Sequence, residues 1–174
     1  GHSMGGYVTL AFVDKYPEKT AGFCLFHSSP FADTEEKKIN RDRQIMLVKE
    51  GKKDQLYKMH VPKTFATDNI TTFQHEIEKQ KEIASKTSDQ GIIAALEGMK
   101  VRPDRSVLLA NSTLPFLYIL GMKDNFIPAN ILSNMKMPEK SQTLTLKNSG
   151  HMGFIEEKKQ ALEGFTYTLK KYLK

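Results

Sequence analysis

The sequence predicts an α/β fold in which a mostly parallel sheet is flanked by helices and interrupted by a helical insertion. Two short apolar runs, residues 21–27 and 114–120, have the length and composition of strands that are buried on both faces. A helix-like stretch precedes the first run. Residues 31–105, between the runs, are polar with apolar side chains at helical spacing. Alternation of helices and buried strands is typical of a parallel sheet.

The first thirty residues predict one helix and one strand. Residues 7–16 are apolar nearly all round and end at Pro17, so we expect a helix that is buried against the sheet. The strand at residues 21–27 is closed by the sequence Ser-Ser-Pro. Cys24 lies within this strand, where a buried structural thiol is expected. As the only cysteine it excludes an internal disulfide, which fits a reducing compartment.

The insertion predicts a small layer of helices. Asp33 followed by Glu36 has the spacing of a helix N-cap and its capping-box partner, opening a helix that runs to about Lys49. Three weaker helical patterns follow, at residues 54–65, 70–85 and 88–100. Most of their apolar side chains should pack together. Some could line a pocket, since methionine side chains adapt to irregular apolar sites.

The last part of the chain predicts a return to the sheet. The strand at residues 114–120 is followed by Asp124 and by a short helix with Pro128 in its first turn. Residues 141–147 alternate apolar and polar side chains, as a strand nearer the sheet edge would. Residues 157–173 predict an amphipathic helix that closes the domain with one apolar face, formed by Leu162, Phe165, Leu169 and Tyr172.

Composition and charge exclude several classes of protein. The 174 residues are 39% hydrophobic and 26% charged, as in ordinary globular proteins, and no apolar run approaches the roughly 18–20 residues of a membrane span. The net charge is +6, but basic residues alternate with acidic ones and no aromatic-rich basic motif accompanies them, so nucleic-acid binding is not expected. We expect a cytoplasmic protein, although any leader would lie upstream of Gly1.

The first six residues, Gly-His-Ser-Met-Gly-Gly, contain the pattern Gly-x-Ser-x-Gly of a nucleophile elbow. In such a turn the serine, here Ser3, is held clear of the sheet with a positive φ, and Gly1 and Gly5 keep the neighbouring space free of Cβ atoms. The backbone N–H of Met4 is the expected first donor to an oxyanion. The pattern alone is weak, because a flexible Gly/Ser loop has the same composition.

Two further residues, Asp124 and His151, strengthen the interpretation of this pattern as a nucleophile elbow. Asp124 follows a buried strand and His151 lies in the loop after the next strand, so the chain order is Ser, Asp, His. Ser3 is a poor nucleophile unless a base removes its proton. A histidine is the natural base near neutral pH, and an aspartate orients it and stabilises the imidazolium.

These motifs resemble the C-terminal portion of an α/β-hydrolase fold protein of the capped, esterase-like kind. The resemblance to this family rests on three motifs: the elbow, residues 120–128 around Asp124, and residues 149–156 around His151. The resemblance implies Ser3 as nucleophile, Asp124 as acid, His151 as base and Met4 N–H in the oxyanion hole. It also implies that residues 31–105 form a helical cap inserted between two parts of the hydrolase core, residues 1–30 and 106–174.

The chain departs from this family in one large respect. The family has about five strands before the elbow, and the loop that supplies the second oxyanion N–H lies among them. We therefore expect this chain to be a truncated part of a longer protein. An exposed strand edge would also allow self-association with another copy.

The resemblance implies a serine hydrolase that cleaves an ester or similar acyl bond in a small, partly apolar substrate. Amide, thioester and carbon–carbon bonds stay open, because fold does not fix function. Two alternatives are a non-catalytic ligand-binding protein of the same fold and an inactive fragment that self-associates. We expect no cofactor and no metal.

Candidate substrate contacts are His2, His27 and Met152, although a packing role is the commoner one for such histidines. His60 and His75 are expected at surface positions, because neither has partners at metal-ligand spacing.

Overall fold

A computed structural model describes residues 1–172 of the chain and confirms the α/β fold. The sheet of these residues contains β1 (Phe23–Phe26), β2 (Phe116–Gly121) and β3 (Ser141–Leu146). The α-helices are α1 (Met4–Lys15), α2 (Glu35–Lys49), α3 (Lys53–Lys63), α4 (Gln74–Lys86), α5 (Asp89–Val101), α6 (Ser106–Ala110), α7 (Gly153–Glu156) and α8 (Lys158–Tyr172). Short 3-10 helices lie at Pro17–Lys19, Thr67–Asn69 and Ala129–Asn134. No helix in residues 1–172 is long and apolar enough to cross a membrane.

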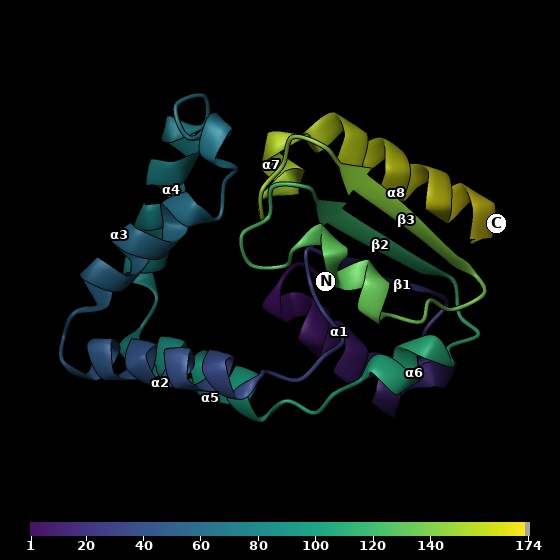
Figure 1. The fold of residues 1–174 in the computed structure, drawn as a ribbon, viewed down its shortest axis with the longest axis horizontal. Coiled ribbons are helices and arrows are strands. Elements are labelled where there is room, and N and C mark those ends of the chain that lie inside the picture. Colours follow the sequence, from purple (N-terminus) through teal and green to yellow (C-terminus); the bar gives the residue numbers. More distant parts are fainter. Residues whose placement is uncertain (173–174) are drawn as a thin grey trace.

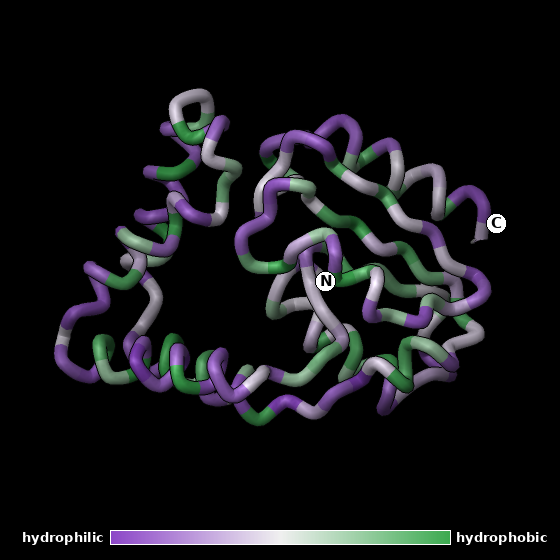
Figure 2. Tube along the Cα trace, in the orientation of Figure 1, coloured by the Kyte–Doolittle hydropathy of each residue, from purple (hydrophilic) through white to green (hydrophobic). Residues whose placement is uncertain are grey.

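The three strands are parallel and lie in the order β1-β2-β3. Phe116 pairs with Phe23 on one side and with Ser141 on the other. All six residues of β2 are buried, as expected of a central strand with a continuous apolar sequence. β3 alternates more exposed with more buried positions, as its sequence predicted. Figure 2 shows hydrophobic residues gathered along the central strands, whereas the helical layer is largely hydrophilic.

Helices cover both faces of the sheet. One face packs against α1 and α6, through a core that includes Leu10, Leu109 and Tyr118. The other face packs against α8, with Ala161 against Leu117 and other strand residues. Figure 1 shows this layered core beside a separate group of helices, α2 to α5. In this helical layer α2 lies against α5 and α3 against α4.

The start of α2 differs from the sequence prediction. Thr34 is the N-cap, and its side chain accepts a hydrogen bond from the backbone N–H of Lys37. Asp33 is buried and forms ion pairs with Arg41 and Arg102 instead. The prediction that Asp33 caps α2 was therefore wrong, because its carboxylate binds Arg41 of the same helix and Arg102, which is distant in sequence.

The contact face of α8 also differs from the prediction. The helix forms, but Leu162, Phe165 and Leu169 are between 39% and 61% exposed, while Ala161 and Thr168 are buried. A Cβ at Gly164 would lie 2.5 Å from Leu144 Cδ2, so the helix meets β3 through its small residues. Close approach of helix and strand thus favours the small side chains over the larger apolar ones.

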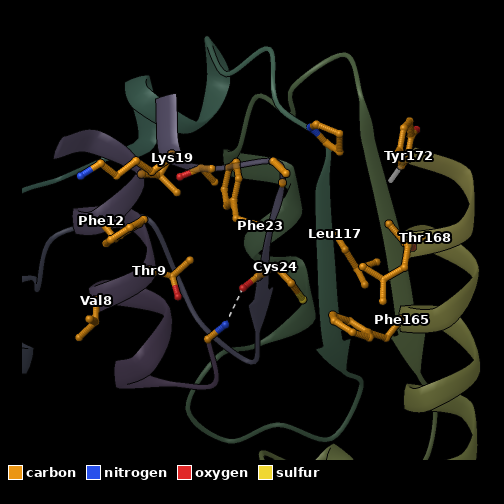
Figure 3. Close-up of a pocket in the computed structure, with 17 residues that line it drawn as sticks. Val8, Thr9, Phe12, Lys19, Phe23, Cys24, Leu117, Phe165, Thr168 and Tyr172 are labelled. Atoms are coloured by element: carbon orange, nitrogen blue, oxygen red, sulfur yellow. Dashed lines mark hydrogen bonds between the residues drawn. The ribbon is translucent and has the colours of Figure 1, made fainter. Parts of the chain in front are cut away.

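Phe165 and Leu169 of α8 face α1 across an apolar hollow of about 570 Å³ (Figure 3). Phe12 of α1, Cys24 of β1 and Phe165 of α8 line it. The amino group of Gly1 donates a hydrogen bond to the Cys24 carbonyl at 2.8 Å (Figure 3). Burial raises the pKa of the Cys24 thiol to about 12, but the residue is half-buried and not fully buried as the sequence predicted.

The first residues of the chain lie beside β1. His2 forms an isolated parallel bridge with Phe26. Phe26 N donates to the Gly1 carbonyl and Ser3 N donates to the Phe26 carbonyl, both at 2.9 Å. These bonds fix the elbow beside the carboxyl end of β1, where ligands of open parallel sheets bind.

Gly121 offers a test of the contact between β2 and the histidine loop. A Cβ at Gly121 would lie 2.3 Å from the Gly150 carbonyl oxygen and 2.5 Å from that of Ser149, so backbone would have to move. We expect Gly121→Ala to lower the free energy of unfolding by about 1–3 kcal/mol. Urea denaturation measures this change.

Gly98→Ala is the matched control, because a Cβ at this helical position has no neighbour within 4 Å. Alanine there should raise the free energy of unfolding by about 0.5–1 kcal/mol. Equal stability of wild type and Gly121→Ala would contradict the close packing described here.

Candidate active site

The elbow places Ser3 in a strained turn. Ser3 has φ 51° and ψ −122° and is the N-cap of α1, whose first residue is Met4. This conformation costs a non-glycine residue about 1–3 kcal/mol. A Cβ at Gly1 would lie 2.3 Å from the Gly5 carbonyl oxygen, so only glycine fits at position 1. A Cβ at Gly5 would meet nothing within 4 Å among the described residues, so the expectation that Gly5 clears space is not supported by a contact.

Asp124 is a buried carboxylate at the end of β2 and accepts four hydrogen bonds. Its Oδ1 accepts from the backbone N–H groups of Phe126 at 2.7 Å and Ile127 at 3.0 Å. Its Oδ2 accepts from Nδ1 of His151 at 2.8 Å and from Nδ1 of His27 at 3.0 Å. Burial alone would raise the pKa of Asp124, but the hydrogen bonds from His151 and His27 outweigh burial and hold the pKa well below its usual range.

His151 lies in the loop between β3 and α7 and is buried. Because Nδ1 donates to Asp124, Nε2 is the ring nitrogen left free to act as a base. The backbone N–H of His151 donates to the Thr64 carbonyl at 2.7 Å, directly after α3. Glu156 adds a second tie, since its carboxylate accepts from Gly150 N at 2.9 Å and from Ala66 N at 2.8 Å. The helical layer therefore helps to hold the histidine loop.

Ser3 and His151 line the same cavity, which has a volume of about 570 Å³. Phe126 and Ile127, which follow Asp124, form another part of its wall. The remaining lining comes from Tyr7 and from the helices α2, α3 and α5. The structure thus brings the elbow and the histidine loop to one side of a cavity that the helical layer encloses from the other.

His27 has a role that the sequence did not reveal. It is fully buried, has φ 47°, and donates to the same Asp124 oxygen as His151. A Cβ at Gly153 would lie 2.4 Å from His27 Nε2, so the glycine makes room for the ring. His27 Nε2 has no hydrogen-bond partner among residues 1–172. The parallel pairing of β1 with β2, which both end at this edge, is the signal that could have predicted the contact.

The other predicted contact residues lie outside the cavity lining. His2 Nε2 lies 2.7 Å from the His151 carbonyl oxygen, and burial lowers the pKa of His2 to about 4. Met152 is buried against Phe65 and Ile77. Like His27, both lie behind the lining residues, and their contact with a substrate stays a prediction.

His60 was expected at the surface but lines the cavity. Burial, followed by the charge of Lys63, lowers its pKa. Sequence alone could not place it, because the fold of the helical layer decides which face of α3 turns toward Ser3.

His27, Asp124 and His151 each offer one potential metal-ligand atom, and these three atoms lie within 4.8 Å of one another, close enough to bind one metal ion. Both Nδ1 atoms already donate to Asp124, however, so these hydrogen bonds account for the cluster.

The chain is similar to known lipases and to solved structures of esterases. No protein-family model matches the chain. It is 25% identical over 166 residues to Lipase 1 of Psychrobacter immobilis, covering 90% of this chain and 50% of the lipase. Lipase 3 of Moraxella sp. (strain TA144) is 23% identical over 171 residues, which cover 95% of this chain and 53% of that lipase. The chain thus spans about half the length of these curated relatives.

Solved structures show the same fold. A thermophilic esterase from Thermogutta terrifontis, determined with malate bound, superimposes with a TM-score of 0.92 at 28% identity over 99% of this chain and 64% of its own. MGS-M2, an α/β hydrolase from a deep-sea metagenome, superimposes with a TM-score of 0.81 at 20% identity over 100% of this chain and 64% of its own. The chain therefore has the α/β-hydrolase fold and is similar to about two thirds of the length of these solved structures.

Proposed function

We propose that the chain carries the catalytic residues of a serine hydrolase that cleaves an ester or similar acyl bond in a small, partly apolar substrate. One observation carries the proposal: Ser3, in a strained elbow, lines one cavity with His151, whose ring is held by a buried and ionised Asp124. This arrangement provides a nucleophile, a base and an orienting acid.

In the proposed reaction Ser3 Oγ attacks the carbonyl carbon and His151 Nε2 takes the hydroxyl proton. Asp124 stabilises the imidazolium, and the Met4 N–H at the start of α1 donates to the oxyanion. First-turn N–H groups have no carbonyl partner within their helix, so Met4 N–H is suited to this role. His151 then protonates the leaving alcohol, which leaves the acyl group on Ser3 Oγ. In the second half of the reaction His151 takes a proton from water, the water oxygen attacks the acyl carbon, and His151 returns the proton to Ser3 Oγ as the acid leaves.

His27 is a positioning residue in this proposal. Its hydrogen bond to Asp124 fixes the carboxylate from the β1 side while His151 binds from the β3 side.

The similarity to lipases and esterases supports ester chemistry. The partial coverage of these relatives supports the hypothesis that the chain is part of a longer hydrolase, in which a second oxyanion donor comes from outside residues 1–174. A cytoplasmic location stays a prediction.

Covalent labelling tests the nucleophile. Intact mass spectrometry after exposure to a fluorophosphonate should show one adduct on the wild type and none on Ser3→Ala, because the reagent reacts with activated serines. Ser133→Ala, which removes an exposed hydroxyl outside the cavity, should label like the wild type. An unlabelled wild type would favour the non-catalytic or inactive-fragment alternatives, and labelling that survives Ser3→Ala would refute the assignment of Ser3.

Asp124 should make stability depend on pH. Its folded-state pKa is lowered, so its contribution is fully present above the unfolded-state pKa of about 3.9 and is lost as the pH falls through the folded-state value. We expect Asp124→Asn to lower the free energy of unfolding at pH 7 by about 2–4 kcal/mol. Urea denaturation at pH 7, 5 and 3 should show this deficit shrinking below about pH 4.

Asp14→Asn is the control, because Asp14 forms a half-exposed ion pair with Arg105. This substitution should lower the free energy of unfolding by less than about 1 kcal/mol. A deficit for Asp124→Asn that stays constant from pH 7 to pH 3 would contradict the lowered pKa.

The rate of labelling tests His27. In His27→Leu, the Asp124 carboxylate loses the hydrogen bond from the β1 side, so the ring of His151 should be held less well. The rate of fluorophosphonate labelling should then fall by about tenfold, which corresponds to the loss of about one hydrogen bond. His27→Asn, which can still donate to the carboxylate, should stay near the wild-type rate. Equal losses in both variants would indicate a packing role alone.

A further inference from the structure

The cavity beside Ser3 has one strongly basic wall. The exposed and half-exposed side chains of α2 form this wall, and they are Lys37, Asn40, Arg41, Arg43 and Gln44. They lie on adjoining rows of one helix, three or four residues apart, so they present a continuous surface. Among the residues that the structure describes, no aspartate or glutamate lines the cavity. A ligand in this cavity therefore meets positive charge that no lining carboxylate balances.

The neighbouring carboxylates leave this charge uncompensated. Asp33 lies behind the wall and binds Arg41, but it also binds Arg102 at 2.7 Å, so two guanidinium groups share one carboxylate. Lys37 and Arg43 form no ion pair with any carboxylate in residues 1–172. Arg43 instead donates to the Asn40 side-chain oxygen at 3.1 Å.

None of the acidic residues of α2 lines the cavity, and Glu36 forms no ion pair in residues 1–172. Glu35 pairs with Lys38 at 2.7 Å, and Asp42 pairs with Lys100. Asp33 holds Arg41 through two nitrogens, which fixes the guanidinium instead of leaving it to move with solvent. The basic wall thus combines one fixed cation with two that have no carboxylate partner in residues 1–172.

Much of the remaining lining is apolar. It is formed by Leu47, Leu56, Met59, Leu96, Met99 and Phe126. A volume of about 570 Å³ lies within the range of about 300–1,000 Å³ found for small-molecule sites. The cavity therefore suits a small ligand with both an apolar part and a negative charge.

We propose that this site selects esters that carry a carboxylate, such as half-esters of dicarboxylic acids, and that Lys37 and Arg43 bind the anionic end. This inference rests on the proposed function, because it assigns a substrate class to the cavity that contains Ser3. Attraction between the carboxylate and the two cations favours the acid over a neutral ester of the same shape.

Binding is measured by calorimetry on Ser3→Ala protein, so the result does not depend on turnover at Ser3. The probes are monoethyl glutarate and its neutral amide, ethyl 5-amino-5-oxopentanoate, which have nearly the same shape. At low salt the acid should bind about tenfold more tightly than the amide. The preference should weaken between about 10 mM and 1 M salt, as the screening length falls from about 30 Å to about 3 Å.

The variant Lys37→Gln/Arg43→Gln, in the Ser3→Ala background, should bind acid and amide equally. Lys136→Gln/Lys159→Gln removes the same net charge from exposed positions outside the cavity and should keep the preference. Equal binding of the two probes to the protein with its basic wall intact would overturn the inference. A preference that survives the loss of Lys37 and Arg43 would overturn it too.

The fluorophosphonate result separates this inference from the proposed function. Labelling of Ser3 without a preference for the acid would leave the hydrolase in place and refute only the substrate class. A preference for the acid without labelling of Ser3 would favour the non-catalytic or inactive-fragment alternatives and leave an anion-binding cavity.

Discussion

The buried carboxylate of Asp124 is the interaction on which the rest of the site depends. It joins the ends of three chain segments: its own turn after β2, His27 after β1, and His151 after β3. A buried charge is tolerated only when its hydrogen-bonding capacity is satisfied, and here four donors satisfy it. The same bonds keep the carboxylate ionised and fix the ring of the histidine that faces the cavity.

The helical layer does more than cover this site. Thr64 and Ala66, just after α3, bond to the histidine loop directly and through Glu156. The same layer supplies the basic and apolar walls of the cavity through α2, α3 and α5. A movement of this layer would therefore change both the histidine loop and the shape of the cavity.

The predictions from sequence agree most closely with the structure for the buried strands and for the pair Asp124 and His151. The apolar runs at residues 21–27 and 114–120 became β1 and β2, because a strand buried on both faces requires a continuous apolar sequence. The structure also places Asp124 and His151 at hydrogen-bond distance, as their positions after adjacent strands predicted. Disagreement arose where long-range partners compete, as for Asp33, which binds Arg102 instead of capping α2.

The sequence by itself determined the fold class, the order of the elements and the three residues proposed for catalysis, because periodicity and short motifs are local properties of the chain. Only the tertiary structure decided that His27 shares the carboxylate of Asp124, that His60 lines the cavity, and that α8 meets the sheet through its small side chains. These features depend on which elements lie side by side and how closely they approach. Only the tertiary structure also showed that Lys37, Arg41 and Arg43 of α2 line the same cavity as Ser3.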